Sequence, residues 1–418
     1  NVPVVRDEGS YDTLPLAIID TEEYIITVCL EETPVLSYFN EKSARFFRTF
    51  KKTRFLFQIL YRSATFYLRY LRLGGKVTPK TDSEVQLPAV SVIVCAHNEY
   101  DNLQDYLSIL LEQDYPCYEV IVVDDSSEDG SDLLLERWSR QYGNLYHTFV
   151  PRGARVLSNK KLALTIGIKA AHYDYLLLTD ADCRPESKHW IREMMQGFSN
   201  EQTELVIGFS PYFEKKGLLN HIIGYDTLFN GLQYMGMARA GKPYMGVGRN
   251  LAYKRETFFS TGGFKGLLSN RAGDDDLFVN RIATASNTTV VNNSDSLIWS
   301  VPKTTWREWF HQKRRHLSVS PQYRTRSKIQ VTLEPLSRGI FYASLLISAI
   351  VGNIELISIA LALFLLRLLV QLIIINVSAR RLNMRGYSLG LIAYDIILPL
   401  ITLYMMLTQP LQKKPLYW

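Results

Sequence analysis

The stretch SVIVCAHNEYDNLQDYLSILLEQDYPCYEVIVVDDSS, residues 91–127, decides the fold of this chain. It begins in an apolar run, continues with a helix-like spacing of apolar residues over 100–111, and ends in a second apolar run, 120–123, followed by Asp124 and Asp125. Continuous apolar runs of this length are typical of strands that are buried on both faces of a parallel sheet. The stretch therefore predicts a β-α-β unit with polar residues at the strand ends.

The same alternation continues downstream. Residues 131–142 again have the spacing of a helix, and a third apolar run, 175–178, ends at Asp180. Open α/β sheets bind their ligands beyond the carboxyl ends of the strands, so acidic residues at these positions mark a candidate site. We expect an α/β fold with a Rossmann-like, mostly parallel sheet over residues 88–300.

Composition and charge limit the partners and divide the chain. The net charge is +6, and Lys and Arg crowd between Lys303 and Lys328, just ahead of the most apolar part. This pattern favours a membrane surface or phosphate-bearing substrates over nucleic acid. The four cysteines form no CxxC pair, so we expect free thiols and no zinc site. We divide the chain into five parts. They are an N-terminal α+β piece (1–75), a linker (76–87), a catalytic domain (88–300), an amphipathic segment at the membrane interface (301–335) and a transmembrane region (336–410).

Three apolar segments near the C-terminus predict membrane crossings. They cover residues 336–352, 354–377 and 389–407, and a helical crossing needs about 20 apolar residues. Arginines between the second and third segments would lie in the cytoplasm by the positive-inside bias. We therefore expect a multi-pass protein of the cytoplasmic (inner) membrane, with about three transmembrane helices and a cytosolic catalytic domain. Buried core helices are the alternative.

Two charged residues lie near the centres of predicted crossings. A lone charge at the middle of a bilayer costs several kcal/mol by most estimates. We therefore expect Arg367 and Asp395 to face each other or a polar cavity.

Carboxylates follow two of the predicted strands. Asp124 and Asp125 could accept hydrogen bonds from a nucleotide base or ribose, or they could cap the next helix. Asp180 and Asp182, in the sequence DAD, stand two residues apart after a buried strand. Such a pair can share a hard cation, Mg²⁺ or Mn²⁺, with substrate phosphates and so neutralise a departing diphosphate.

Two further groups could take part in chemistry. Lys160 and Lys161 begin a helical pattern, where they could meet a diphosphate near the positive end of the helix dipole or could simply be solvated. Asp274, Asp275 and Asp276 are consecutive, and their mutual repulsion should raise at least one pKa. A carboxylate tuned in this way can act as a general base, although a solvated acidic turn fits the pattern too.

The segment WREWFHQKRRHL, residues 306–317, has a helical pattern with two different faces. One face carries aromatic residues and Lys313, which suits a membrane interface. The other face carries three polar residues that could reach the site: Gln312, Arg315 and His316.

Taken together, these motifs resemble those of bacterial membrane-bound family 2 glycosyltransferases, which have the A-type glycosyltransferase fold. The resemblance runs from about residue 88 to the C-terminus and rests on segments in the family's order: SVIVCAHNE (91–99), VVDDSSEDGS (122–131), KKLALTIGIKAA (160–171), LLTDADC (177–183), GVGRNLAYKRETF (246–258), AGDDDLF (272–278) and QKRRH (312–316). It implies an inverting transfer, assisted by Mg²⁺ or Mn²⁺, from a nucleotide-sugar donor to a lipid-linked or surface-glycan acceptor, in contact with membrane lipids.

The resemblance also implies roles for single residues. Donor binding would fall to Asp124, Asp125, Lys161, Asp180 and Asp182, of which Asp180 and Asp182 would also hold the metal. Asp275 would be the catalytic base, with Asp274 as its alternative, because the alignment is ambiguous by one residue. The acceptor or diphosphate would meet residues that resemble a Q-x-x-R-W motif, namely Gln312, Arg315 and His316, where His316 replaces the usual Trp.

Two other classes of protein compete with this interpretation. A nucleotidyltransferase has a similar α/β fold and an acidic metal pair, but it ordinarily shows a Gly-rich phosphate loop, which residues 95–102 lack. A non-enzymatic membrane protein or transporter fragment is the second. Within the glycosyltransferase class, three crossings are few for a polysaccharide channel, so transfer of single sugars is preferred to processive synthesis.

The first 73 residues resemble a different protein. Segments 12–32 and 51–72 are similar to the cytosolic domain of CorA-type magnesium transporters, without the pore helix or the Gly-Met-Asn signature. We therefore expect a gene fusion or chimera joined near residues 73–76. The alternative is an unfamiliar extension that only resembles the transporter.

Overall fold

The structure is a computed structural model of the chain. It describes residues 2–6, 10–14, 16–20, 25–29, 87–151, 158–268, 272–352, 354–388 and 390–408. These residues fall into two compact units. The first contains the N-terminal strands and residues 339–365, and the second, the catalytic unit, contains the described residues between 87 and 338 and between 366 and 408.

The N-terminal strands form two antiparallel pairs. In order, β1 (Val2–Arg6) pairs with β2 (Ser10–Leu14), and β3 (Leu16–Asp20) pairs with β4 (Ile25–Cys29). Strands predicted near 14–19 and 24–30 therefore correspond to β3 and β4, which pair with each other and not with the large sheet. The helix predicted between residues 41 and 73 lies outside the described residues.

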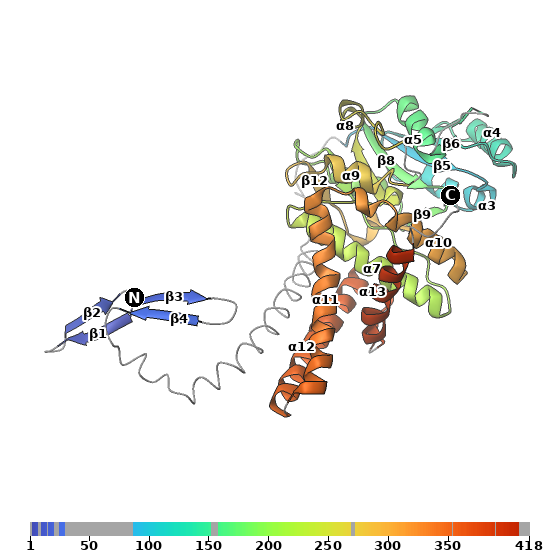
Figure 1. The fold of residues 1–418 in the computed structure, drawn as a ribbon. Helices are drawn as coiled ribbons and strands as arrows, with labels where there is room; N and C mark the ends of the chain where they lie inside the picture. The colour runs from blue at the N-terminus through green and yellow to red at the C-terminus, as the bar shows by residue number, and fades with distance from the viewer. Residues whose placement is uncertain are drawn as a thin grey trace. The chain divides into compact units, whose positions relative to one another are not determined.

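A seven-stranded sheet forms the centre of the catalytic unit, in the order β12-β10-β11-β8-β5-β6-β7 (Figure 1). Its strands are β5 (Val90–Ala96), β6 (Tyr118–Asp124), β7 (Leu145–Phe149), β8 (Tyr175–Asp180), β10 (Leu205–Ile207), β11 (Leu251–Lys254) and β12 (Thr288–Val290). Only β11 runs antiparallel to its neighbours in this sheet. The predicted α/β fold with a mostly parallel sheet is confirmed. A short antiparallel pair, β9 (Cys183–Pro185) and β13 (Ile298–Ser300), lies outside this sheet.

Helices cover both faces of the sheet because alternate strand residues point to opposite sides. Val92 and Val94 join one apolar core, whereas Ile93 and Cys95 join the other. The first core is closed by α3 (Tyr100–Leu111), α4 (Ser131–Gln141) and α6 (Trp190–Gln196). The second is closed by α5 (Asn159–Ala170), α7 (Leu218–Arg239), α8 (Arg255–Ser260), α9 (Asp276–Ile282) and α10 (Trp306–Leu317).

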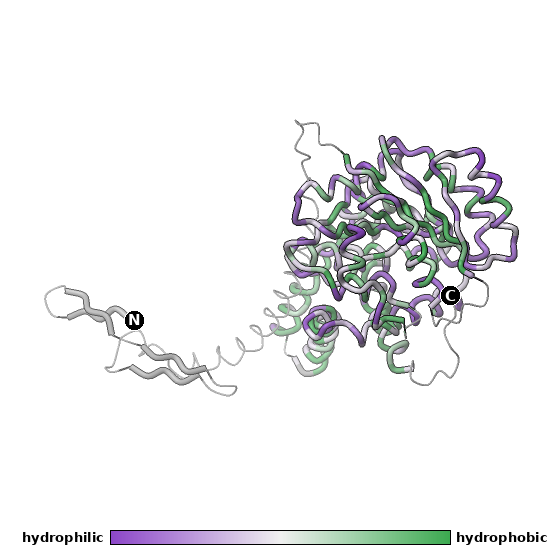
Figure 2. Tube along the Cα trace, turned by 90° about the horizontal axis from the view of Figure 1, so that it is seen from above, coloured by the Kyte–Doolittle hydropathy of each residue, from purple (hydrophilic) through white to green (hydrophobic). Residues whose placement is uncertain are grey.

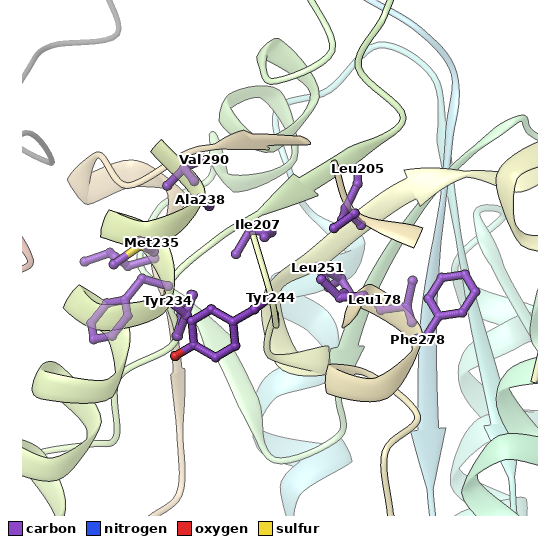
Figure 3. Packing of buried hydrophobic residues seen from close by; sticks show 14 of the residues in the cluster. Leu178, Leu205, Ile207, Tyr234, Met235, Ala238, Tyr244, Leu251, Phe278 and Val290 are labelled. Carbon is purple, nitrogen blue, oxygen red and sulfur yellow. The ribbon is translucent and has the colours of Figure 1, made fainter. Parts of the chain in front are cut away.

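The packing of α7 on the sheet shows how this second core is built. Tyr234, Met235 and Ala238 of α7 lie beside strand residues such as Ile207 and Leu251, and all of these side chains are buried (Figure 3). Hydrophobic residues accordingly concentrate along the strands, and hydrophilic residues concentrate in the outer loops (Figure 2). The buried strands therefore hold their carboxyl ends in fixed positions.

Three long helices follow: α11 (Thr325–Val351), α12 (Ile354–Arg381) and α13 (Leu391–Thr408). Within the described residues, two of them, α12 and α13, are long and apolar enough to cross a membrane. The segment 336–352, predicted as the first crossing, is instead part of α11, which also contains Pro335 and a buried ion pair. The prediction of about three crossings is therefore corrected to two candidate helices.

Charged residues of these helices form a closed network inside the catalytic unit. The Arg367 guanidinium lies 2.7 Å from one oxygen of Asp395, and Arg338 lies 3.0 Å from the other. Arg338 also pairs with Glu334 at 2.6 Å. The expectation that Arg367 and Asp395 face each other is confirmed, and the two added partners balance the charge of the buried group.

Candidate active site

Neighbouring strand ends bring the first acidic residues together. Ala96 lies opposite Asp124, and Cys95 lies opposite Asp180, so the carboxyl ends of β6, β5 and β8 are adjacent. This is the edge of the sheet at which the sequence predicted a site.

The two aspartates after β6 have different surroundings. Both oxygens of Asp124 are within 3.3 Å of the backbone N–H of Ser127, so this carboxylate holds the turn that follows the strand. Asp125 is buried beside His97 and Asn159. Burial raises the pKa of the Asp125 carboxyl, and the charge of His97 and a hydrogen bond from Asn159 oppose the rise. Asp125 is therefore the better placed of the two to bind a ligand.

The DAD pair lies at the end of β8. Ser300 donates to Asp182 at 3.1 Å, which ties the second carboxylate to the small β9–β13 sheet. Burial, together with the neighbouring charge of Asp180, raises the pKa of Asp182. Asp180 is affected in the opposite direction: burial would raise its pKa, but Lys160 outweighs that effect and holds it below the usual value.

The two lysines at the start of α5 point to different places. The Lys160 ammonium lies 2.7 Å from Asp180 and 3.7 Å from Asp274, so it bridges two acidic segments of the site. Lys161, which the sequence placed at the donor, is fully buried and donates to the carbonyl of Ala272 at 2.7 Å. Lys160 therefore occupies the position expected for Lys161, and Lys161 supports the loop that carries the aspartates.

The acidic loop 274–276 begins α9. Asp275 caps this helix by accepting from the backbone N–H of Asp276 at 2.7 Å, and its other oxygen accepts from the backbone N–H of Gly248 at 2.8 Å. A Cβ on Gly248 would lie 3.3 Å from the Cβ of Asp275, so the glycine permits this close approach. Burial and the adjacent charge of Asp274 raise the pKa of Asp275, as expected from the sequence.

Asp276 binds a partner outside the acidic loop. Its side chain accepts from the hydroxyl of Tyr323 at 2.8 Å, and the backbone N–H of Arg324 donates to Asn280 at 2.8 Å. Burial and the charge of Asp275 raise the pKa of Asp276 to about 8. Tyr323 thus anchors the acidic loop to the segment between α10 and α11, a link that connects residues far apart in the sequence.

Helix α10 begins with a capping box in which Thr305 and Glu308 each accept from the other's backbone N–H. Its face predicted for the membrane interface is partly buried instead, since Trp309 is in the core and Lys313 pairs with Asp226 of α7 at 2.6 Å. Trp306 alone among its tryptophans is exposed, with 42% of its surface accessible.

The three polar residues predicted on α10 differ in their surroundings. Gln312 donates to the hydroxyl of Tyr212 at 3.0 Å. Arg315 is close enough to help lower the pKa of Asp180, after the larger effects of burial and Lys160. Desolvation, followed by the charges of Arg315 and Arg249, lowers the pKa of His316, so this side chain lies near the same basic groups as the acidic pair. Gln312, Arg315 and His316 thus all lie near the site residues.

One site residue was given no role by the sequence. The guanidinium of Arg249 lies 4.3 Å from the ring centre of Tyr212, and its charge opposes the rise in the pKa of Asp182 that burial and Asp180 cause. It follows Gly248, whose N–H binds Asp275, in a short 3₁₀ turn. The sequence signal for this residue was the motif GRN, which lies within the segment 246–258 that resembles the glycosyltransferase motif.

The donor set fits a divalent cation shared with a substrate. Asp180 and Asp182 offer hard oxygen ligands two residues apart at the end of β8, the kind that a divalent cation prefers. Among the described residues, no three His, Cys, Asp or Glu side chains converge on one point, so further ligands would come from substrate oxygens or water.

The fold and the acidic strand ends define an A-type glycosyltransferase. Residues 56–409 match glycosyl transferase family 21, and the chain belongs to this family. The match replaces the expected family 2. It also begins inside the segment that resembled a magnesium transporter, so residues 56–73 match the glycosyltransferase family, and the transporter resemblance stays a prediction for the residues before them.

Individual relatives agree with this class. The chain is 24% identical over 254 residues to the probable glycosyltransferase YdaM of Bacillus subtilis, a match that covers 60% of this chain and 59% of that protein. It is 32% identical over 97 residues to the poly-beta-1,6-N-acetyl-D-glucosamine synthase of Staphylococcus epidermidis, covering 23% of this chain and 22% of the synthase. Each match therefore covers less than two thirds of the relative's length.

A solved structure shares the fold. The mannosyltransferase PcManGT from Pyrobaculum calidifontis, in complex with GDP-Man and Mn²⁺, superposes with a TM-score of 0.58 at 18% identity. The likeness covers 87% of this chain and 99% of the mannosyltransferase. The A-type fold predicted from the sequence is confirmed.

Proposed function

We propose that this glycosyltransferase moves a sugar from a nucleotide-sugar donor to a lipid-linked or surface-glycan acceptor at a membrane, by an inverting displacement assisted by Mg²⁺ or Mn²⁺. The observation that carries the proposal is that the Lys160 ammonium joins Asp180, at 2.7 Å, to Asp274, at 3.7 Å, beside the adjacent carboxyl ends of β5, β6 and β8, which Asp125 and Asp182 closely follow. Such a grouping suits a donor that carries a base and a diphosphate, together with an acceptor whose hydroxyl is the nucleophile.

Asp125 and the pair Asp180 and Asp182 bind different parts of the donor. The carboxylate of Asp125, at the end of β6 beside Asn159, accepts hydrogen bonds from the base or ribose. Asp180 and Asp182 hold the cation, which when bound offsets charge on the leaving diphosphate. Lys160, Arg249 and Arg315 add positive charge next to these carboxylates, where diphosphate oxygens would lie.

Asp275 acts on the acceptor. Its carboxylate takes the proton from the acceptor hydroxyl as that oxygen forms a bond to the anomeric carbon, and the bond from this carbon to the diphosphate oxygen breaks. Because attack and departure occur on opposite sides, one displacement inverts the anomeric centre. Gly248 and the start of α9 fix the carboxylate through both of its oxygens.

A panel of nucleotide sugars with Mg²⁺ or Mn²⁺ tests the proposal. We expect one or a few donors to be hydrolysed slowly, and to be transferred when a membrane extract supplies the acceptor. Asp182→Asn should abolish cation-dependent binding of the nucleoside diphosphate in calorimetry, while Asp132→Asn, at an exposed aspartate, should bind normally. Unchanged binding in Asp182→Asn would remove this residue from the metal site, and nucleotidyl transfer in place of sugar transfer would refute the proposal.

Lys160 gives a second prediction, because its ammonium lies on Asp180. Removing this positive charge in Lys160→Ala should strengthen Mn²⁺ binding to the nucleotide-free protein several-fold, since like charges no longer repel. The same change should weaken binding of the nucleoside diphosphate. Titration of Mn²⁺ by electron paramagnetic resonance measures the first effect, and calorimetry measures the second. Lys169→Ala, at an exposed position of the same helix, is the matched control. If Mn²⁺ binds more weakly to Lys160→Ala, then Lys160 supports the cation site instead of competing with it.

A further inference from the structure

Both ends of helix α13 contact other helices of the catalytic unit, although α13 is apolar enough to cross a membrane. Near its first turn, the hydroxyl of Tyr394 lies 2.8 Å from His221 of α7. At its last residue, Thr408 accepts a hydrogen bond from Arg314 of α10 at 3.3 Å. The middle of the helix is held as well, because Asp395, Leu398 and other residues of α13 belong to buried parts of the unit.

These contacts conflict with a crossing along the membrane normal. A helix of 18 residues is about 27 Å long, nearly the thickness of the hydrocarbon layer. If α13 crossed, His221 and Arg314 would lie near opposite faces of the bilayer, and the part of the catalytic unit between them would lie in hydrocarbon.

The catalytic unit carries charges next to both ends of the helix. Before the first turn, Arg385 pairs with Glu214 at 3.5 Å and donates to Asn220 at 2.6 Å. Next to the last turn, α10 carries Arg314 and the ion pair of Lys313 with Asp226. Charged groups at bilayer depth cost several kcal/mol each, so both ends lie at the level of headgroups or water, and only the position of the catalytic unit between them distinguishes the two orientations.

The outer face of α13 suits lipid. Its buried positions recur with helical spacing at Leu391, Asp395, Leu398 and Met405. The large side chains that remain exposed are Ile396, Ile397, Leu400, Leu403, Tyr404, Met406 and Leu407. This face carries no charge, and α10, which meets the end of α13, adds the exposed residues Trp306 and Arg307. An uncharged apolar face of this kind can lie against lipid, and exposed Trp and Arg side chains are typical of the membrane–water interface.

We propose that α13 does not cross the bilayer but lies along one leaflet, on the same side as the catalytic unit, with its exposed face in the lipid. The helix then docks the catalytic unit onto the membrane. This placement does not depend on the sugar or the acceptor.

Thiol labelling from one side of sealed vesicles tests the proposal in the full-length protein. The exposed Cys117 marks the side of the catalytic unit when it is kept in a Cys29→Ser background. Ser388→Cys, before α13, and Thr408→Cys, at its end, are each placed in a background with Cys29→Ser and Cys117→Ser. We expect a membrane-impermeant maleimide to label all three thiols from the same side. Labelling of Ser388→Cys and Thr408→Cys from opposite sides would overturn the proposal.

A second variant tests the orientation of α13 if the thiols of Ser388→Cys and Thr408→Cys react poorly. Leu400 lies on the exposed face in the middle of the helix, with 59% of its surface accessible. In a helix along one leaflet, Leu400→Lys can extend its ammonium to the headgroups, so the protein should stay membrane-bound and folded. Loss of the folded protein would indicate a bilayer-centre position and overturn the proposal. A quantitative disulfide-linked dimer of Leu400→Cys would also overturn it, because the face would then meet a second copy of the chain.

Discussion

Replacement of Asp275 by asparagine is expected to slow sugar transfer by about 10²- to 10⁴-fold, the range that general acid–base catalysis contributes. The amide keeps the volume of the side chain but cannot take the acceptor's proton. Donor binding should survive, because the amide can keep the contacts with Gly248 and the start of α9, and Asp180, Asp182 and Lys160 are unchanged. Transfer rate and donor affinity, measured separately on the same preparation, check the prediction.

The transfer rate of the native protein should also depend on pH, because Asp275 must be deprotonated to act as a base. A base acts only when it is deprotonated, and burial with the charge of Asp274 raises the pKa of Asp275. Transfer should therefore fall as the pH drops through this raised value, at a higher pH than an ordinary aspartate would give.

Two control variants identify the base. Asp274→Asn alters the adjacent carboxylate, and Asp295→Asn alters an exposed aspartate that should have no effect. If Asp275→Asn transfers normally and Asp274→Asn does not, the base is Asp274 and the alignment to the family motif shifts by one residue.

The second large effect is expected at Asp395. Asp395→Leu should lower the free energy of unfolding by about 3–5 kcal/mol, the cost of removing one partner from a buried ion pair. Arg338 and Arg367 would then be buried with Glu334 as the remaining carboxylate of the network. Unfolding of the detergent-solubilised protein, followed by loss of near-UV circular dichroism, measures the change.

A double variant separates charge balance from packing. Arg367→Leu combined with Asp395→Leu removes one charge of each sign and leaves Arg338 paired with Glu334 at 2.6 Å. The double variant should therefore be more stable than Asp395→Leu alone. Exchange of the two charges, Arg367→Asp with Asp395→Arg, should fail to rescue stability, because the introduced arginine would face Arg338. Equal stability of the single and double leucine variants would show that packing, and not charge, determines the loss.

The sequence predicts three central strands of the sheet, β5, β6 and β8, because each is an unbroken apolar run, and β6 and β8 end in aspartates. It does not predict β7, β10, β11 or β12, which are shorter or contain polar residues. It could not distinguish Asp124 from Asp125, since that depends on which carboxylate meets the N–H of Ser127 in the turn. It also could not choose between Lys160 and Lys161, because successive residues of a helix point about 100° apart and only the packed structure shows which face is buried.

Other parts of the site depend on contacts between distant segments. Tyr323 reaches Asp276 across 47 positions of sequence, and no local pattern signals that bond. The orientation of the helices near the C-terminus is harder to predict. The length of an apolar segment identifies a helix that can enter a bilayer. It does not show whether a folded domain contacts both ends of that helix. The third expected crossing has a similar cause. Its apolar segment has the length of a crossing, but in the structure it continues a helix whose first half is charged.

The order of the charged network along the chain has a consequence for biosynthesis. Asp395 is made 57 residues after Arg338, and Arg367 also precedes it. Until α13 emerges from the ribosome, the two arginines have only Glu334 within the network to balance them. This layer of helices therefore reaches its final packing only at a late step of translation, and a nascent chain that stalls before Asp395 should expose unbalanced arginines to quality-control proteases.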